Sequence, residues 1–483
     1  MEERVEDEYR EGQDRLGMPV ITNGALDNVI TAVHAVHGLT LLRDLLTSAA
    51  GQAVLHLLEG LTVSTPDPVT VAKAYSEAFQ QLALATQVDA TPELSDAWQA
   101  HLAARLIDAG NLWSSQVERV GSAYISSTLR AQARRDLRAM QRIFSLDAQT
   151  LWRLTSAAVT PSMPILRNAW MPWHDLMPDV EQTRTTMRAA LARQIAASDD
   201  WAELVTPLEE YWSRYGTGSL ARYSVLRWQG TDHHLAGIQY PDSIQLSSLI
   251  GHERQQTRLR SNIERFIAGL PAHDILLYGP PGTGKSSTVK ALANTYAEQG
   301  LCLLEIAKEH ISDLPYVATQ LRDRAPHYLI FIDDLSFEEH ETAYKVLKVL
   351  LEGTVEARPA NMLICATSNR INIIRENFKD RGQPTEDINW RDTMDEKQSL
   401  AHRFGLRITF ATPDQQQYLH IVSELARQRG LDVPEELLQE RALQWERLHV
   451  GRSGRVARQF VDDLEADLKY TPIPEPETAT HPV

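Results

Sequence analysis

The sequence predicts an α/β domain with a parallel sheet, followed by a three-helix segment and preceded by an all-α region. Three observations lead to this prediction. From about residue 249, short apolar runs alternate with helical patterns, which is typical of parallel strands joined by crossover helices. After Thr412 and Pro413, three helical stretches follow one another without a strand between them. Before residue 232, apolar residues recur mainly at the three-and-four spacing of amphipathic helices.

The strand candidates are short, apolar and nearly continuous, as expected for strands covered by helices on both faces. They are Ile275–Tyr278, Leu301–Ile306, Tyr328–Ile332, Met362–Ala366 and Leu406–Phe410. The same patterns predict the domain limits: an acidic disordered lead-in (1–22), a helical N-terminal domain (23–232), a linker (233–248), the sheet domain (249–411), a helical lid (412–470) and a disordered tail (471–483).

The charge and composition limit the partners. The 483 residues carry a formal net charge of −16, so no summed basic field exists to drive general binding to nucleic acid or an anionic membrane. The N-terminus has no apolar signal core, and no apolar run is long enough to span a bilayer. Cys302 and Cys365 lie in apolar runs and suit core positions in a reducing compartment. We therefore expect a cytoplasmic protein with no membrane partner, for which nucleic acid is not the expected partner overall.

The strongest motif begins where the first strand candidate ends. Gly279 to Ser286 have the spacing Gly-x-x-x-x-Gly-Lys-Ser, in which backbone N–H groups converge on phosphate oxygens and glycines permit the close approach. Lys285 would reach the terminal phosphates, and the Ser286 hydroxyl would ligate Mg²⁺. The sequence thus predicts a nucleotide-binding P-loop made by Gly279, Pro280, Pro281, Gly282, Thr283, Gly284, Lys285, Ser286 and Ser287.

Two acids, Asp333 and Asp334, follow the strand candidate Tyr328–Ile332. Such a pair can simply begin a turn, but in a protein with a P-loop earlier in the sequence it has a specific role. Asp333 would hold Mg²⁺ through water, and Asp334 would lie near the attacking water. We therefore predict Ser286 and Asp333 as metal ligands and Asp334 as a catalytic residue.

Together with Ala366–Asn369 and the three-helix segment, these motifs resemble those of the AAA+ ATPases. The resemblance covers about Gln245 to Leu468. More narrowly, three segments resemble the sequences of a bacterial AAA+ family of uncharacterised function. They are Leu276–Ser287, Phe331–Glu338 and Ser453–Phe460. The resemblance implies an ATPase that uses ATP and Mg²⁺ and forms a homo-oligomer, as a ring or a partial ring.

The resemblance also implies roles for single residues. Ile250 and Gly251 would pack on adenine, although an ordinary helix lead-in would look the same. Asn369 would act as a sensor that orients water and the γ-phosphate, with a turn-forming Asn as the alternative. Arg403 stands where AAA+ proteins carry an arginine finger that reaches the ATP of a neighbouring subunit; a surface arginine at a helix end is the alternative.

Arg455 has a physical argument of its own. Ser453 reads as the N-cap of the last helix, which places Arg455 in the first turn, where the helix dipole disfavours a cation by roughly 0.3–1 kcal/mol. A cation at this positive helix end is favourable if the side chain and the helix N-terminus both face an anion. We therefore predict that Arg455 contacts ATP phosphate from the lid, with Arg458 as the fallback and a tolerated surface arginine as the alternative.

Two departures from the AAA+ pattern bear on mechanism. Many AAA+ enzymes have Glu at the position of Asp334, whose shorter side chain would polarise water less well. Hydrolysis is therefore expected to be slow unless Glu338 or a bridging water compensates. The region Ala307–Ile311 lacks the aromatic-hydrophobic-glycine loop of AAA+ unfoldases, so polypeptide threading is not supported.

One helical stretch carries Arg130, Arg134, Arg138 and Arg142 at four-residue spacing, which lines one helix face with guanidinium groups. Pairing with local acids is the favoured interpretation of this arginine stripe. The alternative is contact with an acidic partner or a phosphate backbone.

We expect an ATPase that hydrolyses ATP at sites between subunits to drive a conformational change or the remodelling of an unknown protein partner. The helical N-terminal domain would contact that partner. Two alternatives stay open: an ATP-gated interaction scaffold with slow turnover, which Asp334 makes plausible, and a nucleic-acid loader that uses the arginine stripe.

Overall fold

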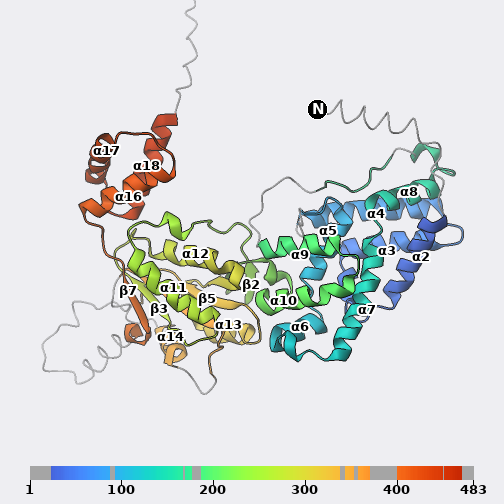
Figure 1. The fold of residues 1–483 in the computed structure, drawn as a ribbon, viewed down its shortest axis with the longest axis horizontal. Coiled ribbons are helices and arrows are strands. Elements are labelled where there is room, and N and C mark those ends of the chain that lie inside the picture. The colour runs from blue at the N-terminus through green and yellow to red at the C-terminus, as the bar shows by residue number, and fades with distance from the viewer. Residues whose placement is uncertain are drawn as a thin grey trace, which may run out of the picture. The chain divides into compact units, whose positions relative to one another are not determined.

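The computed structural model describes residues 23–87, 93–166, 169–176, 186–337, 343–352, 357–369, 400–449 and 451–469. The predicted lead-in and tail, and Glu338, lie outside these ranges. The chain divides into two compact units (Figure 1). The first, called here the helical unit, comprises the residues up to Tyr223 and the short segment Asp323–Pro326. The second, the sheet unit, comprises Ser224–Arg322 and the residues from His327 onward.

Several helices of the helical unit begin at residues whose side chains cap them. Asp67 accepts the N–H of Thr70 at 3.0 Å, and Asp96 accepts the N–H of Trp98 at 2.9 Å. The helices are α2 (Asn23–His37), α3 (Ala49–Thr62), α4 (Pro68–Thr86), α5 (Ala97–Ile107), α6 (Leu112–Val120), α7 (Ser127–Phe144), α8 (Ala148–Val159), α9 (Thr186–Ala197) and α10 (Val205–Tyr215). The 3-10 turns are η1 (Arg43–Leu46), η2 (Ser122–Tyr124), η3 (Pro164–Leu166), η4 (Trp201–Leu204) and η5 (Ser219–Arg222).

One apolar cluster forms the core of the helical unit, and it includes Trp113 and Trp212, whose rings meet edge to face at 4.7 Å. A buried ionic cluster lies in the same unit. The carboxylate of Asp108, after α5, pairs with Arg188 of α9 and Arg222 of η5. Because a buried carboxylate is costly unless it is paired, this cluster constrains how α5, α9 and η5 meet.

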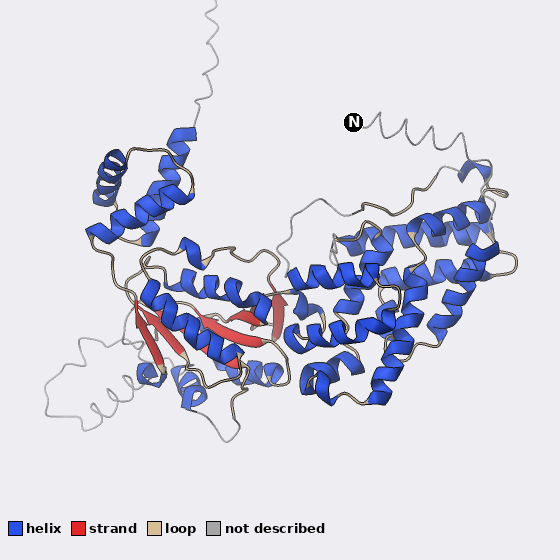
Figure 2. Cartoon of the chain, in the orientation of Figure 1, coloured by secondary structure: helices blue, strands red, loops and turns tan. Residues whose placement is uncertain are grey.

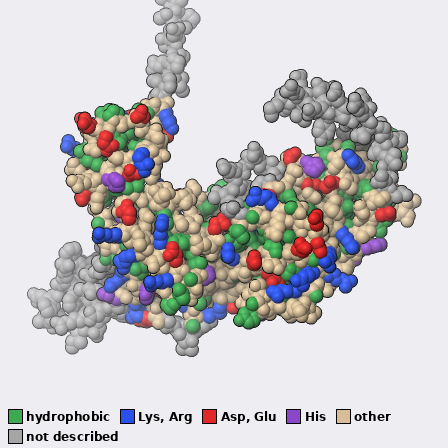
Figure 3. All heavy atoms as spheres, in the orientation of Figure 1, with side chains coloured by type: hydrophobic (Ala, Val, Ile, Leu, Met, Phe, Trp, Pro, Cys, Tyr) green, Lys and Arg blue, Asp and Glu red, His purple; other side chains and the backbone are tan. Residues whose placement is uncertain are grey.

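The arginine stripe lies on α7 and is partly neutralised within the helical unit. Arg130 pairs with the buried Glu209 at 2.7 Å, and Arg138 pairs with Asp200 at 2.7 Å. These two residues therefore pair with acids, but the acids are 79 and 62 positions away in the sequence and not local to the stripe. Arg134 is exposed, and Figure 3 shows Lys and Arg side chains gathered on the helical unit in the region of α7.

In the described residues, the sheet unit has seven strands in the order β2-β1-β4-β5-β6-β3-β7; strands are red in Figure 2. Among these strands, only β1 and β2 pair antiparallel. The five strands predicted from the sequence are confirmed to within two residues at each end. The strands are β1 (Val225–Gln229), β2 (His234–Gly237), β3 (Ile275–Tyr278), β4 (Leu301–Glu305), β5 (His327–Ile332), β6 (Met362–Ser368) and β7 (Leu406–Thr409).

At residues 225–237 the structure differs from the predicted domain limits. The segment expected to end the helical domain at 232 and to begin a linker at 233 contains β1 and β2, which extend the sheet. On β1, Arg227 pairs with Glu305 at 2.7 Å, and the buried Trp228 donates its indole N–H to Asp313 at 2.9 Å. The exposed residues of β1, Arg227 and Gln229, are polar, so β1 lacks the continuous apolar run of β3, β4 and β5.

Helices cover the sheet and complete the unit. They are α11 (Glu253–Ile267), α12 (Lys285–Tyr296), α13 (Leu314–Leu321) and α14 (Ala343–Glu352), with the 3-10 turns η6 (Leu246–Ser248), η7 (Ala297–Gln299) and η8 (Lys308–Asp313). Ile263 of α11 and Val289 of α12 share a buried cluster with alternate residues of the strands. Cys302 of β4 and Cys365 of β6 are buried and not in a disulfide, which agrees with the predicted core positions. None of the helices within the described ranges combines the length and apolar character of a bilayer-spanning segment.

Three helices form the lid, as predicted, with a small core of their own. They are α16 (Gln415–Gln428), α17 (Glu435–Leu448) and α18 (Gly454–Lys469). Asp414 and Gln417 cap α16 reciprocally: Asp414 accepts the N–H of Gln417 at 2.8 Å, and Gln417 accepts the N–H of Asp414 at 3.2 Å. Ile250 packs against the lid core, which joins the lid to the segment that precedes α11.

Candidate functional site

The glycine-rich turn joins β3 to α12 and adopts a backbone that requires glycine. Gly279, Gly282 and Gly284 have φ values of 146°, 78° and 94°. A Cβ on Gly279 would lie 2.0 Å from the carbonyl oxygen of Phe410, which follows β7. This close packing places the start of the turn against the neighbouring strand, and α12 then begins at Lys285 with its N-terminus facing the turn.

The ammonium of Lys285 is held by three oxygens. Its Nζ donates to the carbonyls of Gly279 at 2.7 Å and Pro280 at 2.9 Å, and to Oδ1 of Asn369 at 3.1 Å. Burial lowers the pKa of Lys285 from its usual value, although the charges of Asp333 and Asp334 act in the opposite direction. The amine is therefore positioned between the turn and the ends of β5 and β6.

Asp333 lies at the end of β5 and accepts several hydrogen bonds on one oxygen. Its Oδ1 accepts from the Ser286 hydroxyl at 2.6 Å, from the Thr367 hydroxyl at 2.5 Å and from the backbone N–H of Asp334 at 3.2 Å. Ser286 is the first residue after Lys285 on α12, and Thr367 lies on β6. The hydroxyl of the P-loop and the carboxylate after β5 therefore meet directly, as the metal-site prediction requires of its two ligands.

Asp334 has a left-handed backbone, with φ of 50°, a conformation that Asp and Asn tolerate better than most residues. Its N–H donates to the Thr367 hydroxyl at 2.9 Å, and its Oδ1 accepts from Nδ2 of Asn369 at 2.7 Å. Asn369 follows β6, so its amide connects the carboxylate of Asp334 to the ammonium of Lys285. Strained positions of this kind concentrate at functional sites.

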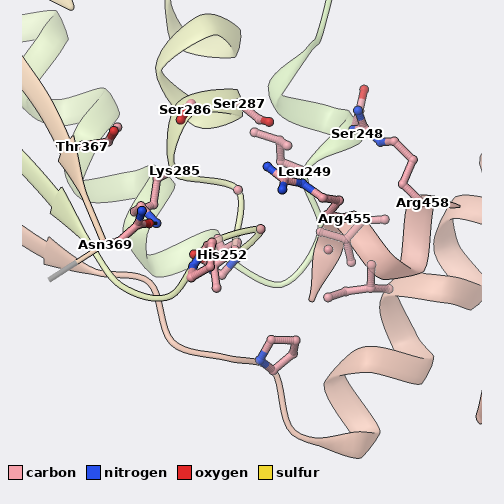
Figure 4. Close-up of a pocket in the computed structure, with 18 of the residues that line it drawn as sticks. Ser248, Leu249, His252, Lys285, Ser286, Ser287, Thr367, Asn369, Arg455 and Arg458 are labelled. Carbon is pink, nitrogen blue, oxygen red and sulfur yellow. Dashed lines mark hydrogen bonds between the residues drawn. The ribbon is translucent and has the colours of Figure 1, made fainter. Parts of the chain in front are cut away.

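These groups line a cavity of about 470 Å³ between the sheet and the lid. Figure 4 shows Lys285 and Asn369 on one side of it and the lid residues Arg455 and Arg458 on the other. The predicted residues that line it are Ile250, Pro281, Gly282, Thr283, Gly284, Lys285, Ser286, Ser287, Asp333, Asp334, Asn369 and Arg455. Gly251, Gly279 and Pro280 belong to the same loops without lining the cavity, and Arg403 lies elsewhere.

The lid meets the P-loop at the start of α18. Ser453 caps this helix by accepting the N–H of Val456 at 3.2 Å, and the N–H of Arg455 donates to the carbonyl of Gly282 at 3.3 Å. Arg455 therefore lies in the first turn of α18, as the sequence predicts, directly against the turn that would hold phosphate. The positive helix end and the positive side chain both face the cavity.

Apolar side chains line part of the cavity, called here the apolar slot. Ile250, predicted to pack on adenine, is one of them, and Gly251, which follows it, has φ of 85°. The rest of the slot was not predicted, because its residues are ordinary apolar side chains from three distant segments. They are Leu249, Pro413, Ile421 and Leu425.

His252, Thr367 and Ser248 also line the cavity without having been predicted. The His252 ring packs on Phe410 at 4.8 Å, and burial lowers the pKa of His252 below its usual value. The position of His252 directly after Ile250–Gly251 was an available signal. For Thr367, the signal was its place two residues before Asn369 on the same strand.

Arg403 has a partner within its own chain. It forms an ion pair with Glu352, the last residue of α14. Its Nε is buried and has no hydrogen-bond partner among the described residues. Since Arg403 does not line the cavity of its own subunit, any contact with nucleotide would have to be made in another subunit.

The oxygen donors near Ser286 fit a magnesium ion. The Ser286 hydroxyl and the Asp333 carboxylate are hard oxygen ligands of the kind Mg²⁺ takes, usually with water and substrate phosphate completing the shell. The described residues contain no cluster of three or more His, Cys, Asp or Glu side chains that would form a dedicated all-protein metal cage. The donor set therefore suits a magnesium ion shared with phosphate.

The fold and this site define the class of the protein. A P-loop after β3, paired acids after β5, an amide after β6 and a three-helix lid make the sheet unit an AAA+ ATPase module. The family model described as "Protein of unknown function (DUF815)" matches residues 221–468. Because this match covers more than half of the chain, the chain belongs to that family.

Curated relatives share shorter stretches with this chain. The ATPase family gene 2 protein of Schizosaccharomyces pombe is 27% identical over 173 residues, which cover 31% of this chain and 21% of the relative. Replication factor C subunit 3 of the same organism is 25% identical over 160 residues, which cover 32% of this chain and 45% of the relative. The chain thus spans less than half of the length of these relatives.

Solved structures align with about half of the chain. The RuvB Holliday junction branch migration motor of Thermotoga maritima aligns with a TM-score of 0.34 and 15% identity, over 47% of this chain and 65% of that chain. The FIGL-1 AAA domain in complex with ADP aligns with a TM-score of 0.31 and 21% identity, over 47% of this chain and 74% of that chain.

Proposed function

We propose that this protein binds ATP with Mg²⁺ in the cavity between sheet and lid and hydrolyses it. The observation that carries the proposal is the meeting of five motif side chains. Ser286 contacts Asp333 at 2.6 Å, and Asn369 contacts both Asp334 at 2.7 Å and Lys285 at 3.1 Å. These residues come from separate parts of the sequence, and a merely structural turn has no need to bring them together.

Each residue has a role that follows from its place. The backbone N–H groups of Gly282, Gly284 and Lys285 and the N-terminus of α12 would hold the phosphates, and Lys285 would balance their charge. Ile250 and the rest of the apolar slot would hold the adenine ring. Ser286 and Asp333 would hold Mg²⁺, which neutralises charge on the β- and γ-phosphates when bound.

Asp334 and Asn369 would act on the attacking water. Asn369 fixes the carboxylate of Asp334 through one amide hydrogen bond and is itself held by Lys285. A positioned carboxylate can accept a proton from the water as it attacks. Because Asp is shorter than the Glu that many AAA+ enzymes have here, we expect slow turnover.

We further propose that subunits assemble into a ring or partial ring in which Arg403 contacts the ATP of a neighbour. Assembly would exchange the ion pair with Glu352 for a contact with phosphate. Nucleotide-dependent movement of the lid would then act on a protein partner bound to the helical unit. The two cysteines are buried and not in a disulfide, which suits a cytoplasmic location.

A second candidate is an ATP-gated scaffold that binds nucleotide tightly and rarely turns over. The specific observation in its favour is Asp334, whose left-handed backbone and hydrogen bond to Asn369 hold a short side chain in place. The nucleic-acid loader has less support, because Arg130 and Arg138 of the arginine stripe are already paired with acids.

The test is steady-state ATP hydrolysis across a range of protein concentrations, for the wild type and the variants Arg403→Ala and Asp334→Glu. Specific activity that rises with concentration and falls in Arg403→Ala supports catalysis between subunits. Negligible activity in the wild type that Asp334→Glu restores supports the scaffold instead. Absence of hydrolysis in every protein, including Asp334→Glu, contradicts the ATPase proposal.

A further inference from the structure

Two arginines of the lid line the cavity. Arg455 and Arg458 lie three residues apart on α18, so they leave neighbouring positions on one side of the helix. Both side chains are exposed, and within the described part of the chain neither guanidinium has a hydrogen bond or an ion pair with an acid. Two unpaired cations therefore face one cavity.

The two guanidinium groups point to different parts of the cavity. In Figure 4, that of Arg455 is directed to the side of Lys285, whereas that of Arg458 lies beside Ser248. The direction of the Arg455 side chain agrees with its charge helping to lower the pKa of Lys285. The backbone N–H of Arg455 also donates to the carbonyl of Gly282 in the P-loop. Arg455 thus belongs to the phosphate end of the cavity.

Arg458 belongs to the other end. Ser248 directly precedes Leu249 and Ile250, which line the apolar slot. The slot is where a nucleobase would lie, so a guanidinium beside Ser248 is closer to the sugar and the first phosphate than to the γ-phosphate. An arginine donates up to five hydrogen bonds and can serve both ribose oxygens and a phosphate.

We propose that Arg458 is a second nucleotide-binding residue of the lid, which contacts the part of the nucleotide that ATP and ADP share. Arg455, by contrast, contacts the terminal phosphates. This inference rests on the proposed function and extends it by assigning the two lid arginines to different parts of the nucleotide. Its consequence is that the lid keeps hold of ADP after the γ-phosphate has left, so product release depends on breaking the Arg458 contact.

The test compares dissociation constants for ADP and for the slowly hydrolysed analogue ATPγS, both with Mg²⁺, by isothermal titration calorimetry on the full chain. The proteins are the wild type, Arg458→Ala, Arg455→Ala and the control Arg447→Ala, whose side chain is exposed on α17 away from the cavity. Arg458→Ala should weaken both nucleotides alike, by about tenfold, as expected for one charge-assisted hydrogen bond. Arg455→Ala should weaken ATPγS more than ADP, and Arg447→Ala should change neither.

Two results would overturn the inference alone. One is wild-type affinity of Arg458→Ala for both nucleotides, and the other is a loss in Arg458→Ala that is confined to ATPγS. A wild type that binds neither nucleotide overturns the proposed function and this inference with it. Because Arg458 is exposed, its replacement should leave the fold intact, and circular dichroism of each variant checks this.

Discussion

The amide of Asn369 donates a hydrogen bond to Oδ1 of Asp334 at 2.7 Å. The other end of the same amide accepts from Lys285 at 3.1 Å, so one side chain connects the P-loop with the ends of β5 and β6. An amide has one donor end and one acceptor end, so the carboxylate of Asp334 and the ammonium of Lys285 together fix the orientation of the Asn369 side chain. The carboxylate of Asp334 is therefore held in place before any nucleotide arrives.

The first prediction concerns Asp334. Asp334→Asn keeps the size and the tolerance for φ of 50° but removes the carboxylate that would accept a proton. We expect the hydrolysis rate to fall by about 100-fold while the affinity for ATP stays within a factor of about two. Single-turnover phosphate release and calorimetric binding of ATPγS measure the two quantities. Unchanged hydrolysis would exclude Asp334 as the catalytic carboxylate.

The second prediction concerns Gly279. In Gly279→Ala, the new Cβ would lie 2.0 Å from the carbonyl oxygen of Phe410, at φ of 146°. We expect a loss of about 1–3 kcal/mol in the free energy of unfolding and a loss of nucleotide affinity. Gly269→Ala is the control, because Gly269 has φ of 68° but open space around it; it should lose some stability and no affinity. Equal nucleotide affinity in the two variants would contradict the close packing of the turn against Phe410.

The third prediction concerns Arg403. If it completes a neighbour's site, Arg403→Ala should bind ATP normally and hydrolyse it slowly. Lys285→Ala should not bind ATP at its own site, but its Arg403 can still complete the site of a neighbouring subunit. Mixing the two variants should therefore give more activity than the sum of the two variants measured alone. Arg407→Ala serves as a control, because Arg407 is an exposed arginine on β7 that does not line the cavity. A mixture without activity would contradict catalysis between subunits.

The fourth prediction concerns the dependence of folding stability on pH. Burial lowers the pKa of both His252 and His327 below the usual 6.5. Between the lowered pKa of the folded state and 6.5, each histidine binds more protons in the unfolded chain than in the folded chain. Its contribution to the free energy of unfolding is therefore fully present above pH 6.5 and decreases as the pH falls through this window. Urea unfolding at several pH values from 7.5 to about 5.5 measures the slope. His327→Gln should reduce that slope, and an unchanged slope in this variant would mean that His327 does not contribute.

Much of the sheet unit could be predicted from the sequence because its determinants are local. A continuous apolar run followed by Gly279–Ser286 specifies a strand, a turn and a helix with little help from the rest of the chain. The acids at 333–334 and the amide at 369 each end such a run. Parallel strands place their carboxyl ends at one edge, so these separate motifs predict a common site.

What the sequence did not reveal depends on contacts between distant segments. The apolar slot takes Leu249, Pro413 and Ile421 from the segment before α11 and from the lid, and no spacing rule connects them. The strand β1, which lies next to the edge strand β2, escaped notice because its exposed residues are polar. The pairing of Arg130 and Arg138 with Glu209 and Asp200 likewise depends on how α7 meets residues about sixty to eighty positions away.

The measurement that tests the central claim most directly is the equilibrium affinity for Mg²⁺–ATP of the wild type, Lys285→Ala and Lys290→Ala. Both lysines lie on α12, but Lys285 is held at the P-loop whereas Lys290 is exposed and pairs with Asp242 at 3.4 Å. The account predicts that the wild type and Lys290→Ala bind ATP equally well and that Lys285→Ala binds at least about tenfold more weakly. A wild type without measurable affinity, or equal affinity in all three proteins, would contradict the assignment of this cavity as an ATP site.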